Sequence, residues 1–426
     1  MFDLLRQRDF GLLWLAGLIS FAGNAALSIA LPLHVYRLTD STLATAAVAA
    51  ANLLPRVLMG SVAGVFVDRW DRKRTMVVVD LARAGALLLI LLAPDRLPVL
   101  FAVGAILGTL SQFFIPAEGA LLPRLVGQDR LVTANALNAL NNNIGMLVGP
   151  AMGALLYATI GIGGTVVVDA ATFVVSATLI SLIASDARPE ASDMPSPGRR
   201  AWDRMANDWR AGIAVVQENL SLRVLFASSV LSHVADGIFI VLGLSPLVLD
   251  VLGGTPAQVG WVASAQAIGG LTVGLVVVRI GHRMTRRWLY GGGAVGTGIA
   301  DFGCANATLI APPGTAAVGV AMGWMVLAGG PVTTYLAGQY AIVQSQAVDA
   351  YRGRVFGALG SVNGIAIVIG VALGGVLGDR IGIVAVLSAG ALLRMLGGIV
   401  ALILLPRDER DVVAALEADG APATTA

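Results

Sequence analysis

The sequence predicts an all-α membrane protein of two pseudo-symmetric six-helix bundles, and three observations support this fold class. Hydrophobic residues make up 57% of the 426 residues, and the mean hydropathy is +0.81, far above that of a soluble globular domain. Apolar windows long enough to cross a bilayer recur twelve times along the chain. Glycines in the first half also recur at matching positions in the second half.

Short polar or charged breaks separate the twelve windows. Their lengths of about 20 to 27 residues suit helices that cross a bilayer with some tilt. The windows lie at approximately 11–35, 43–66, 75–93, 98–120, 134–159, 165–184, 222–249, 257–280, 288–311, 315–340, 355–378 and 383–405.

One long polar stretch follows the sixth window. Its first part is rich in proline, which is typical of a linker. Its second part, Trp202 to Leu220, spaces apolar residues three and four apart and predicts an amphipathic helix on the inner membrane surface. We expect an N-terminal bundle over 1–184, a cytoplasmic linker over 185–221, a C-terminal bundle over 222–405 and a cytoplasmic tail over 406–426.

Basic residues indicate the orientation of the windows. If the first residues are cytoplasmic, only Arg37, Arg96 and Arg380 fall outside, three arginines lie within windows, and the other 22 of the 28 Lys and Arg residues are cytoplasmic. Cytoplasmic loops carry such an excess. The sequence therefore predicts a multi-pass protein of the cytoplasmic (inner) membrane with both termini in the cytoplasm.

The two halves share the spacing of their glycines. Two pairs are offset by 210 residues and three by 221, and Asn24 has a counterpart in Asp236. The glycines are Gly60, Gly64, Gly149, Gly153 and Gly161, which match Gly270, Gly274, Gly370, Gly374 and Gly382. A six-helix unit duplicated in parallel is a recurring transporter plan that places the substrate at the midplane, between the halves.

Several other classes of function are excluded by residue usage. Cys304 is the single cysteine, and the three histidines lack metal-ligand spacing. No phosphate-binding loop is present, and a net charge of +2 does not favour nucleic acid. We expect no enzyme activity, cofactor or metal; the expected partners are the lipid bilayer, a small-molecule substrate and protons, for a protein that acts as a monomer.

Two motifs carry a resemblance to a known family. Gly64-x-x-x-Asp68-Arg69-x-x-x-Lys73-Arg74 joins the second and third windows, and Gly145-x-x-x-Gly149-Pro150-x-x-Gly153 lies in the fifth. With them the chain resembles the major facilitator superfamily. Further runs, among them Leu122 to Val126 and Arg352 to Gly357, are similar to its bacterial subgroup that exports drugs, macrolides and siderophores such as enterobactin.

This resemblance implies the major facilitator fold and transport by alternating access, with proton antiport as the expected coupling. Two departures from the family pattern concern that coupling. The fourth window has no arginine where many drug–proton antiporters carry one, and Asn24 stands where the subgroup often has an acid.

The charged turn after the second window predicts a conformational latch. The Asp68 carboxylate would gain about 0.3–2 kcal/mol at the N-terminus of the eleventh helix and would pair with Arg352 or Arg354. Gly64, Arg69, Asp71, Arg72, Lys73 and Arg74 complete the latch set. The alternative is that the cluster serves only as a topology signal. The glycine motif of the fifth window predicts either a bendable seam or plain close packing.

Ionisable residues inside the windows are candidates for proton and charge handling because they are costly there. Asp236 and His233, three residues apart, are expected to share a helix face. Arg56 would attract an anionic substrate or neutralise an acid, and Glu118 is either a gate or a loop anchor. The remaining residues, expected to be structural or weaker candidates, are Asp80 paired with Arg83, and Asp169, Asp301, Asp379 and Arg394.

Polar amides from several windows predict a cavity that binds amphipathic molecules through adaptable hydrogen bonds. The candidates are Asn24, Asn52, Asn138, Asn142, Gln266, Tyr335, Gln339 and Asn363. At least one asparagine of the run 141–143 is expected to pack structurally, since the run covers most of a helix circumference.

These observations favour a secondary active transporter that exports small amphipathic compounds. The alternatives within this class are a dedicated metabolite or siderophore exporter and a lysophospholipid flippase. An alternative from another class is a membrane receptor or scaffold that does not transport.

Overall fold

The computed structural model describes residues 2–67, 69–185, 199–280 and 284–406. Every regular element within these ranges is a helix. Among the described residues, nine helices are long and apolar enough to cross a membrane. The all-α membrane fold is thus confirmed, and the count of twelve spans stays a prediction.

The first group of helices covers the N-terminal part of the chain. It comprises η1 (Phe2–Arg6), α1 (Arg8–Thr39), α2 (Thr42–Val67), α3 (Arg72–Leu92), α4 (Leu97–Val126), η2 (Gln128–Arg130) and α5 (Leu131–Ser181). At 51 residues, α5 would be about 75 Å long if straight, more than twice the thickness of a bilayer core. Gly161 breaks it with a φ of 69° and a ψ of −174°, where the sequence predicts the turn between two windows.

The second group follows the described part of the linker. It comprises α6 (Arg199–Glu218), α7 (Leu220–Leu242), η4 (Leu247–Val251), α8 (Pro256–Ile280), η6 (Trp288–Gly292), α9 (Gly293–Ala305), η7 (Ala307–Leu309), α10 (Thr315–Gln346), α11 (Asp349–Ile381) and α12 (Ile383–Leu404). The predicted amphipathic helix forms as α6. Val216 on α6 is buried in a cluster with α7, α10 and α11 residues, and Gly212 lies against the Arg354 carbonyl.

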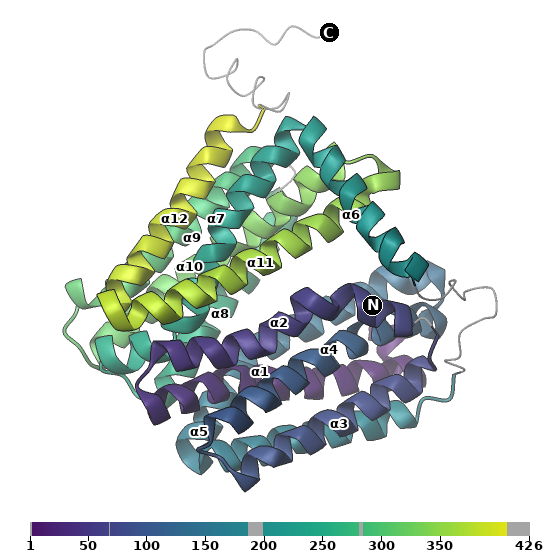
Figure 1. Cartoon of the computed structure of the whole chain (residues 1–426), viewed down its shortest axis with the longest axis horizontal. Helices are drawn as coiled ribbons and strands as arrows, with labels where there is room; N and C mark the ends of the chain where they lie inside the picture. The colour runs from purple at the N-terminus through teal and green to yellow at the C-terminus, as the bar shows by residue number, and fades with distance from the viewer. Residues whose placement is uncertain (1, 68, 186–198, 281–283, 407–426) are drawn as a thin grey trace, which may run out of the picture.

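Most contacts between helices fall within the two groups, and α2–α11 and α5–α8 make most of those that join them. In Figure 1 the first group lies below the second, with α2 and α11 facing each other. We call the end where α1 begins and α6 lies the linker end, and the end where α1 meets α2 the far end.

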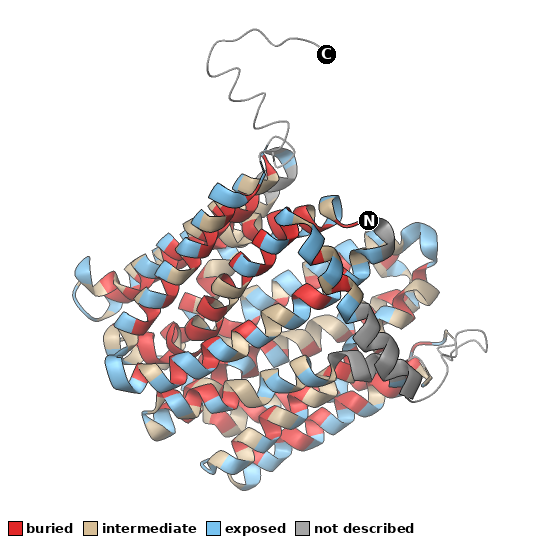
Figure 2. Cartoon of the chain, turned by 45° about the horizontal axis from the view of Figure 1, so that its top comes forward, coloured by how far each residue is buried: buried red, intermediate tan, exposed pale blue. Residues whose placement is uncertain are grey.

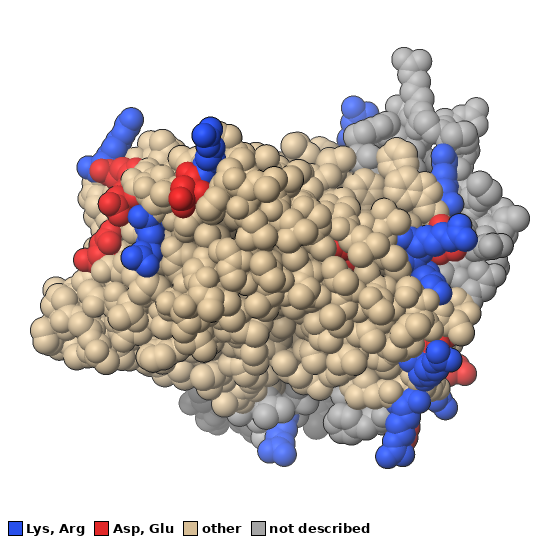
Figure 3. Space-filling view, turned by 90° about the horizontal axis from the view of Figure 1, so that it is seen from below, with Lys and Arg blue, Asp and Glu red and all other residues tan. Residues whose placement is uncertain are grey.

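The surface of the molecule matches a bilayer environment. Exposed positions, many of them leucine, isoleucine or valine, alternate with buried ones along the outer helices (Figure 2). On the face in Figure 3, most charged side chains gather towards the two ends and leave a broad band with few charges between them. Hydrocarbon-facing surface has this composition.

Candidate functional site

The two groups are tied together at the far end by Asp379, near the end of α11. Its carboxylate accepts hydrogen bonds from the Thr42 backbone N–H at 2.9 Å and from Ser41 Oγ at 3.0 Å. Asp379 therefore caps the N-terminus of α2 from the other group, where the helix dipole favours an anion. The sequence predicts a structural role for this residue without indicating its partner.

Two further hydrogen bonds join the groups at the same end. Tyr36 on α1 donates to the Asp250 carboxylate on η4. The Ala151 N–H on α5 donates to Ser264 Oγ on α8 at 3.1 Å. The far end is therefore closed by contacts from three pairs of elements.

A cavity of about 600 Å³ lies between the groups, from mid-helix towards the linker end. Residues of α2, α4, α7, α10 and α11 line it. We call it the central cavity; its lining is Leu53, Arg56, Val57, Gln112, Ile115, His233, Leu336, Gln339, Tyr340, Phe356, Gly357, Leu359, Gly360, Ser361, Asn363, Gly364 and Ile367. Its volume falls in the range of drug-sized binding pockets.

Four residues singled out from the sequence lie in this lining: Arg56, His233, Gln339 and Asn363. His233 Nδ1 lies 2.8 Å from the Ser229 carbonyl. Because a carbonyl oxygen only accepts, Nδ1 carries the proton and Nε2 is left for another partner. Ser229 Oγ in turn donates to Asn363 Oδ1 at 2.9 Å, so α7 and α11 are joined at the cavity wall.

A second cavity, of about 300 Å³, lies on the far-end side and shares Leu53 with the central one. We call it the far cavity. The predicted residues Asn24 and Asn52 line it, together with Ser28, Thr45 and Ser245. Asn52 also donates to the Gly104 carbonyl at 3.3 Å. The far cavity thus combines an apolar wall with a few polar groups.

The other four predicted cavity residues lie outside both cavities. Asn142 is exposed, Asn138 and Gln266 are half-buried, and Tyr335 is buried with its ring stacked on Tyr290 at 4.9 Å between centroids. Their amide and hydroxyl groups resemble those of true lining residues, and only the helix register separates the two sets. Asn141 packs structurally, donating to the Trp14 carbonyl at 2.9 Å.

Sequence reasoning missed polar lining residues, notably Gln112, Tyr340 and Ser361. The sequence could have indicated Gln112 as a lining residue, because a long amide side chain in the middle of an apolar window needs a hydrogen-bond partner or a cavity. Here its Nε2 donates to the Gly108 carbonyl at 3.1 Å.

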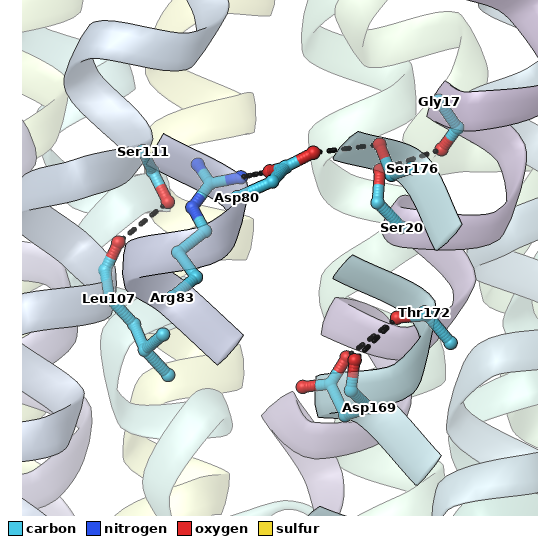
Figure 4. Close-up of polar contacts among 9 residues, drawn as sticks. All are labelled: Gly17, Ser20, Asp80, Arg83, Leu107, Ser111, Asp169, Thr172 and Ser176. Carbon is cyan, nitrogen blue, oxygen red and sulfur yellow. Dashed lines mark hydrogen bonds and ion pairs between the residues drawn. The ribbon is translucent and has the colours of Figure 1, made fainter. Parts of the chain in front are cut away.

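A buried charge cluster lies inside the first group (Figure 4). Arg83 Nη1 and Asp80 Oδ1 on α3 are 3.1 Å apart, which confirms the predicted pair, and Ser176 Oγ on α5 donates to Asp80 at 2.7 Å. The Arg83 guanidinium also interacts electrostatically with Asp169 and Glu118. The buried Arg83–Asp80 ion pair thus has two further acids near it; we call these four residues the Arg83 cluster.

The second group contains a comparable buried cluster. Arg394 on α12 pairs with Asp236 on α7 and, at 3.3 Å from Nε to Oδ2, with Asp301 on α9. Asp236 thus binds Arg394 and His233 binds the Ser229 carbonyl, and the expectation that the two residues share a helix face and handle charge stays a prediction.

The glycine motif of α5 contacts helices of both groups. A Cβ at Gly145 would collide with the Phe21 ring, and one at Gly149 or Gly153 with α1 backbone or Ala25. The Pro150 carbonyl lies against Gly260 of α8. Small residues thus permit close packing within the first group on one side and between the groups on the other.

The predicted latch is only partly visible. Asp68 lies outside the described residues. Asp71 caps α3 by accepting from the Arg74 N–H at 2.9 Å, and Lys73 Nζ donates to the Ile183 carbonyl at 2.6 Å. Arg352 donates to the Gln344 carbonyl at 2.8 Å, and the Arg354 guanidinium lies 5.1 Å from the Tyr351 ring centre.

Bilayer-crossing helices in two groups, with a drug-sized cavity between them, define a multi-pass membrane transporter. The profile of the transmembrane secretion effector family, within the major facilitator superfamily, matches residues 1–423. The chain belongs to this family, which is one of transporters and not of enzymes.

Known relatives agree with this assignment. The multidrug efflux pump Tap of Mycolicibacterium fortuitum is 29% identical over 93% of this chain and 95% of its own. Macrolide efflux protein A of Streptococcus pyogenes is 27% identical over 88% of this chain and 90% of its own. The MFS-type transporter YkuC of Bacillus subtilis is 28% identical over 65% of each chain, slightly less than two thirds of that relative.

Solved structures share the fold. The nucleoside transporter NupG superimposes with a TM-score of 0.74 at 14% identity, covering 94% of this chain and 99% of that one. At this identity the likeness concerns the fold alone, and it confirms the predicted fold class.

Proposed function

We propose that this chain is a secondary active transporter that exports small amphipathic compounds by alternating access, driven by proton entry. The observation that carries the proposal is the central cavity, whose lining comes from both groups while the far end is closed. Relatives named for macrolide and multidrug efflux support the direction and the substrate type.

The orientation follows from the distribution of basic residues. With both termini cytoplasmic, the linker end faces the cytoplasm, because that orientation leaves most Lys and Arg residues on the inner side. The structure then represents an inward-facing state. A compound would enter the central cavity from the cytoplasm or the inner leaflet and leave past the far cavity when the far end opens.

Proton coupling is assigned to the buried charge clusters. Ionisable groups inside a membrane mark proton paths, and the Arg83 cluster gathers three acids and one arginine inside the first group. Glu118 is half-buried, unlike Asp80 and Asp169, which are buried. We assign Glu118 as the exchanging carboxylate of the first group, and Asp236, in its ion pair with Arg394, as the charge-handling residue of the second.

The conformational latch at the linker end remains part of the proposal. Asp68, from its position in the family motif, would hold the outward-open state through the N-terminal region of α11. Asp68→Asn removes the charge and keeps the size of the side chain. We expect strongly reduced transport at normal membrane insertion; undiminished transport by this variant would eliminate the latch.

Transport into inverted membrane vesicles tests the proposed function. A proton gradient is imposed, a pH-sensitive dye reports its dissipation, and uptake of a macrolide, a cationic dye and a catecholate siderophore is measured. We expect uptake of at least one compound together with proton release, and loss of coupling in Glu118→Gln. If no compound in the panel dissipates the gradient, the antiport assignment fails.

A further inference from the structure

We propose that the central cavity selects amphipathic anions, with Arg56 binding the acidic group and the apolar wall binding the body of the molecule. This inference rests on the proposed transport function and specifies the substrate class of its site. It commits to one charge sign where the family resemblance leaves the charge open.

The first argument is the sign of the charge in the lining. The described lining residues of the central cavity include one guanidinium, that of Arg56, one imidazole, that of His233, and no carboxylate. A site for organic cations usually supplies an acid to replace the lost hydration, and the two aromatic rings of this lining, Tyr340 and Phe356, are not accompanied by one. The nearest candidate acid on the same helix as His233, Asp236, binds Arg394 instead.

The second argument is that Arg56 has no counter-ion. No ion pair or hydrogen bond to its side chain occurs within the described ranges, whereas each arginine of the two buried clusters has an acidic partner: Arg83 binds Asp80 and Arg394 binds Asp301. Arg56 lies mid-helix in α2, directly after Pro55. Arg56 is exposed at the cavity in this structure, and a charge midway along a spanning helix without a counter-ion is retained where a ligand or a water-filled path uses it.

The third argument is a surplus of hydrogen-bond donors. Gln339 Nε2 is buried at the cavity wall and has no partner among the described residues. Asn363 accepts from Ser229 through Oδ1, which leaves its amide N–H groups for a ligand. Together with the Arg56 guanidinium, these donors suit a carboxylate or another oxyanion, which offers only acceptors.

The apolar part of the lining indicates what the rest of the ligand is like. Leucine and isoleucine side chains from α2, α4, α10 and α11 surround the cavity, and the Tyr340 and Phe356 rings lie 5.5 Å apart at its α10–α11 side. A planar apolar body bearing one acidic group fits this combination of a rigid aromatic pair and one cationic anchor.

Two xanthene dyes of opposite charge test the inference. Fluorescein is an anion and rhodamine 6G a cation at pH 7.5, and both report binding to the purified full chain in lipid nanodiscs by fluorescence polarisation. We expect fluorescein to bind tighter than rhodamine 6G. Arg56→Gln should weaken fluorescein binding about tenfold or more, the usual loss for a charge-assisted hydrogen bond, and Arg56→Lys should recover much of it.

The matched control is Arg130→Gln, which makes the same chemical change at an exposed arginine outside the cavity. It should leave both affinities unchanged. Because Arg56 has no partner to lose, its variants should keep the elution profile and melting temperature of the parent protein. Tighter binding of rhodamine 6G, an Arg56→Gln variant with full fluorescein affinity, or no binding of either dye would overturn the inference.

Vesicle transport separates this inference from the proposed function. If fluorescein binds through Arg56 but a proton gradient moves no compound, anion selection stands and the exporter assignment fails. If the gradient drives cationic dyes and excludes fluorescein, the exporter assignment stands and anion selection fails.

Discussion

At the scale of single residues, the buried charges are arranged as matched clusters inside each group. The Asp80 and Arg83 side chains are almost fully enclosed, with 0% and 9% exposure, and the Phe114 and Phe173 rings lie 4.9 and 5.4 Å from the guanidinium carbon. Such a site tolerates the charges only as a pair, because each alone would lose its hydration without compensation.

We therefore expect Asp80→Ala to destabilise the protein by about 3–5 kcal/mol, the usual cost of leaving a buried charge unpaired. The double variant Asp80→Ala, Arg83→Met should recover part of this loss, since both charges are then absent. Urea unfolding in a mild detergent measures the difference. Additive effects of the two substitutions would show that the residues do not stabilise each other.

How well such contacts could be predicted depends on their separation in the chain. Asp80 and Arg83 lie one helical turn apart, so helix periodicity alone predicts their pairing. Asp236 and Arg394 lie 158 residues apart, and their contact depends on the register of α7 against α12. No single-sequence pattern encodes that register, so the sequence does not predict this ion pair.

At the scale of helices, the glycine motif of α5 determines how closely α1 and α5 approach. A Cβ at Gly153 would collide with the Ala26 backbone of α1, which cannot move aside as a flexible side chain would. Gly319 on α10 has open space where its Cβ would lie. The two positions therefore provide a matched pair for testing the motif.

We expect Gly153→Ala to lower the melting temperature and the yield of folded protein, because α1 must shift or strain. Gly319→Ala should be neutral or stabilising by about 0.5–1 kcal/mol, since alanine favours the helix over glycine. Thermal unfolding followed by circular dichroism compares the two variants. Equal tolerance of both would mean that the motif does not set the packing distance.

The contact of α11 with α2 is the second feature at this scale. Asp379 accepts from the first backbone N–H groups of α2, so opening of the far end must break these hydrogen bonds and leave Ser41, which accepts from the Ala44 N–H, as the remaining cap. Removing a cap costs about 0.5–2 kcal/mol. Asp379 thus contributes to the stability of the state that is closed at the far end.

Asp379→Asn should shift the population towards states that are open at the far end. The readout is labelling of Thr45→Cys, in the far cavity, by a membrane-impermeant maleimide, in a Cys304→Ala background that removes the single native thiol. We expect labelling to become several-fold faster, in line with the weakened cap. Asp40→Asn should leave the rate unchanged, because this nearby acid makes no such contact between the groups in the described part of the chain.

Helix-scale features were the most predictable part of the fold. Hydropathy windows predict where the apolar helices lie, and periodicity predicts α6, because each property is local in the sequence. The cavity lining was predictable only in part. Gln339 and Asn142 carry the same kind of amide, yet Gln339 lines the central cavity and Asn142 is exposed, since the rotation of each helix depends on packing.

At the scale of the whole molecule, the two cavities lie in series between the groups. The central cavity lies towards the linker end, the far cavity lies beyond Leu53, and the far-end hydrogen bonds lie next to it. Alternating access requires these contacts to break while new ones form at the linker end. The α5–α8 contact at Ala151 and Ser264 is the best placed to block this exchange.

A disulfide between Ala151→Cys and Ser264→Cys, made in the Cys304→Ala background, should hold the far end closed. The Ala151 nitrogen lies 3.1 Å from Ser264 Oγ, and Gly260 of α8 lies against the Ala151 Cα, so the two positions face each other across the α5–α8 contact. We expect the oxidised variant to bind its ligand from the linker end with unchanged affinity and to lose transport. Reduction of the disulfide should restore transport.

The two single-cysteine variants serve as controls, because neither can form the bond. Full transport by quantitatively oxidised protein would mean that α5 and α8 move as one body at this end, and that substrate leaves without the two groups separating there.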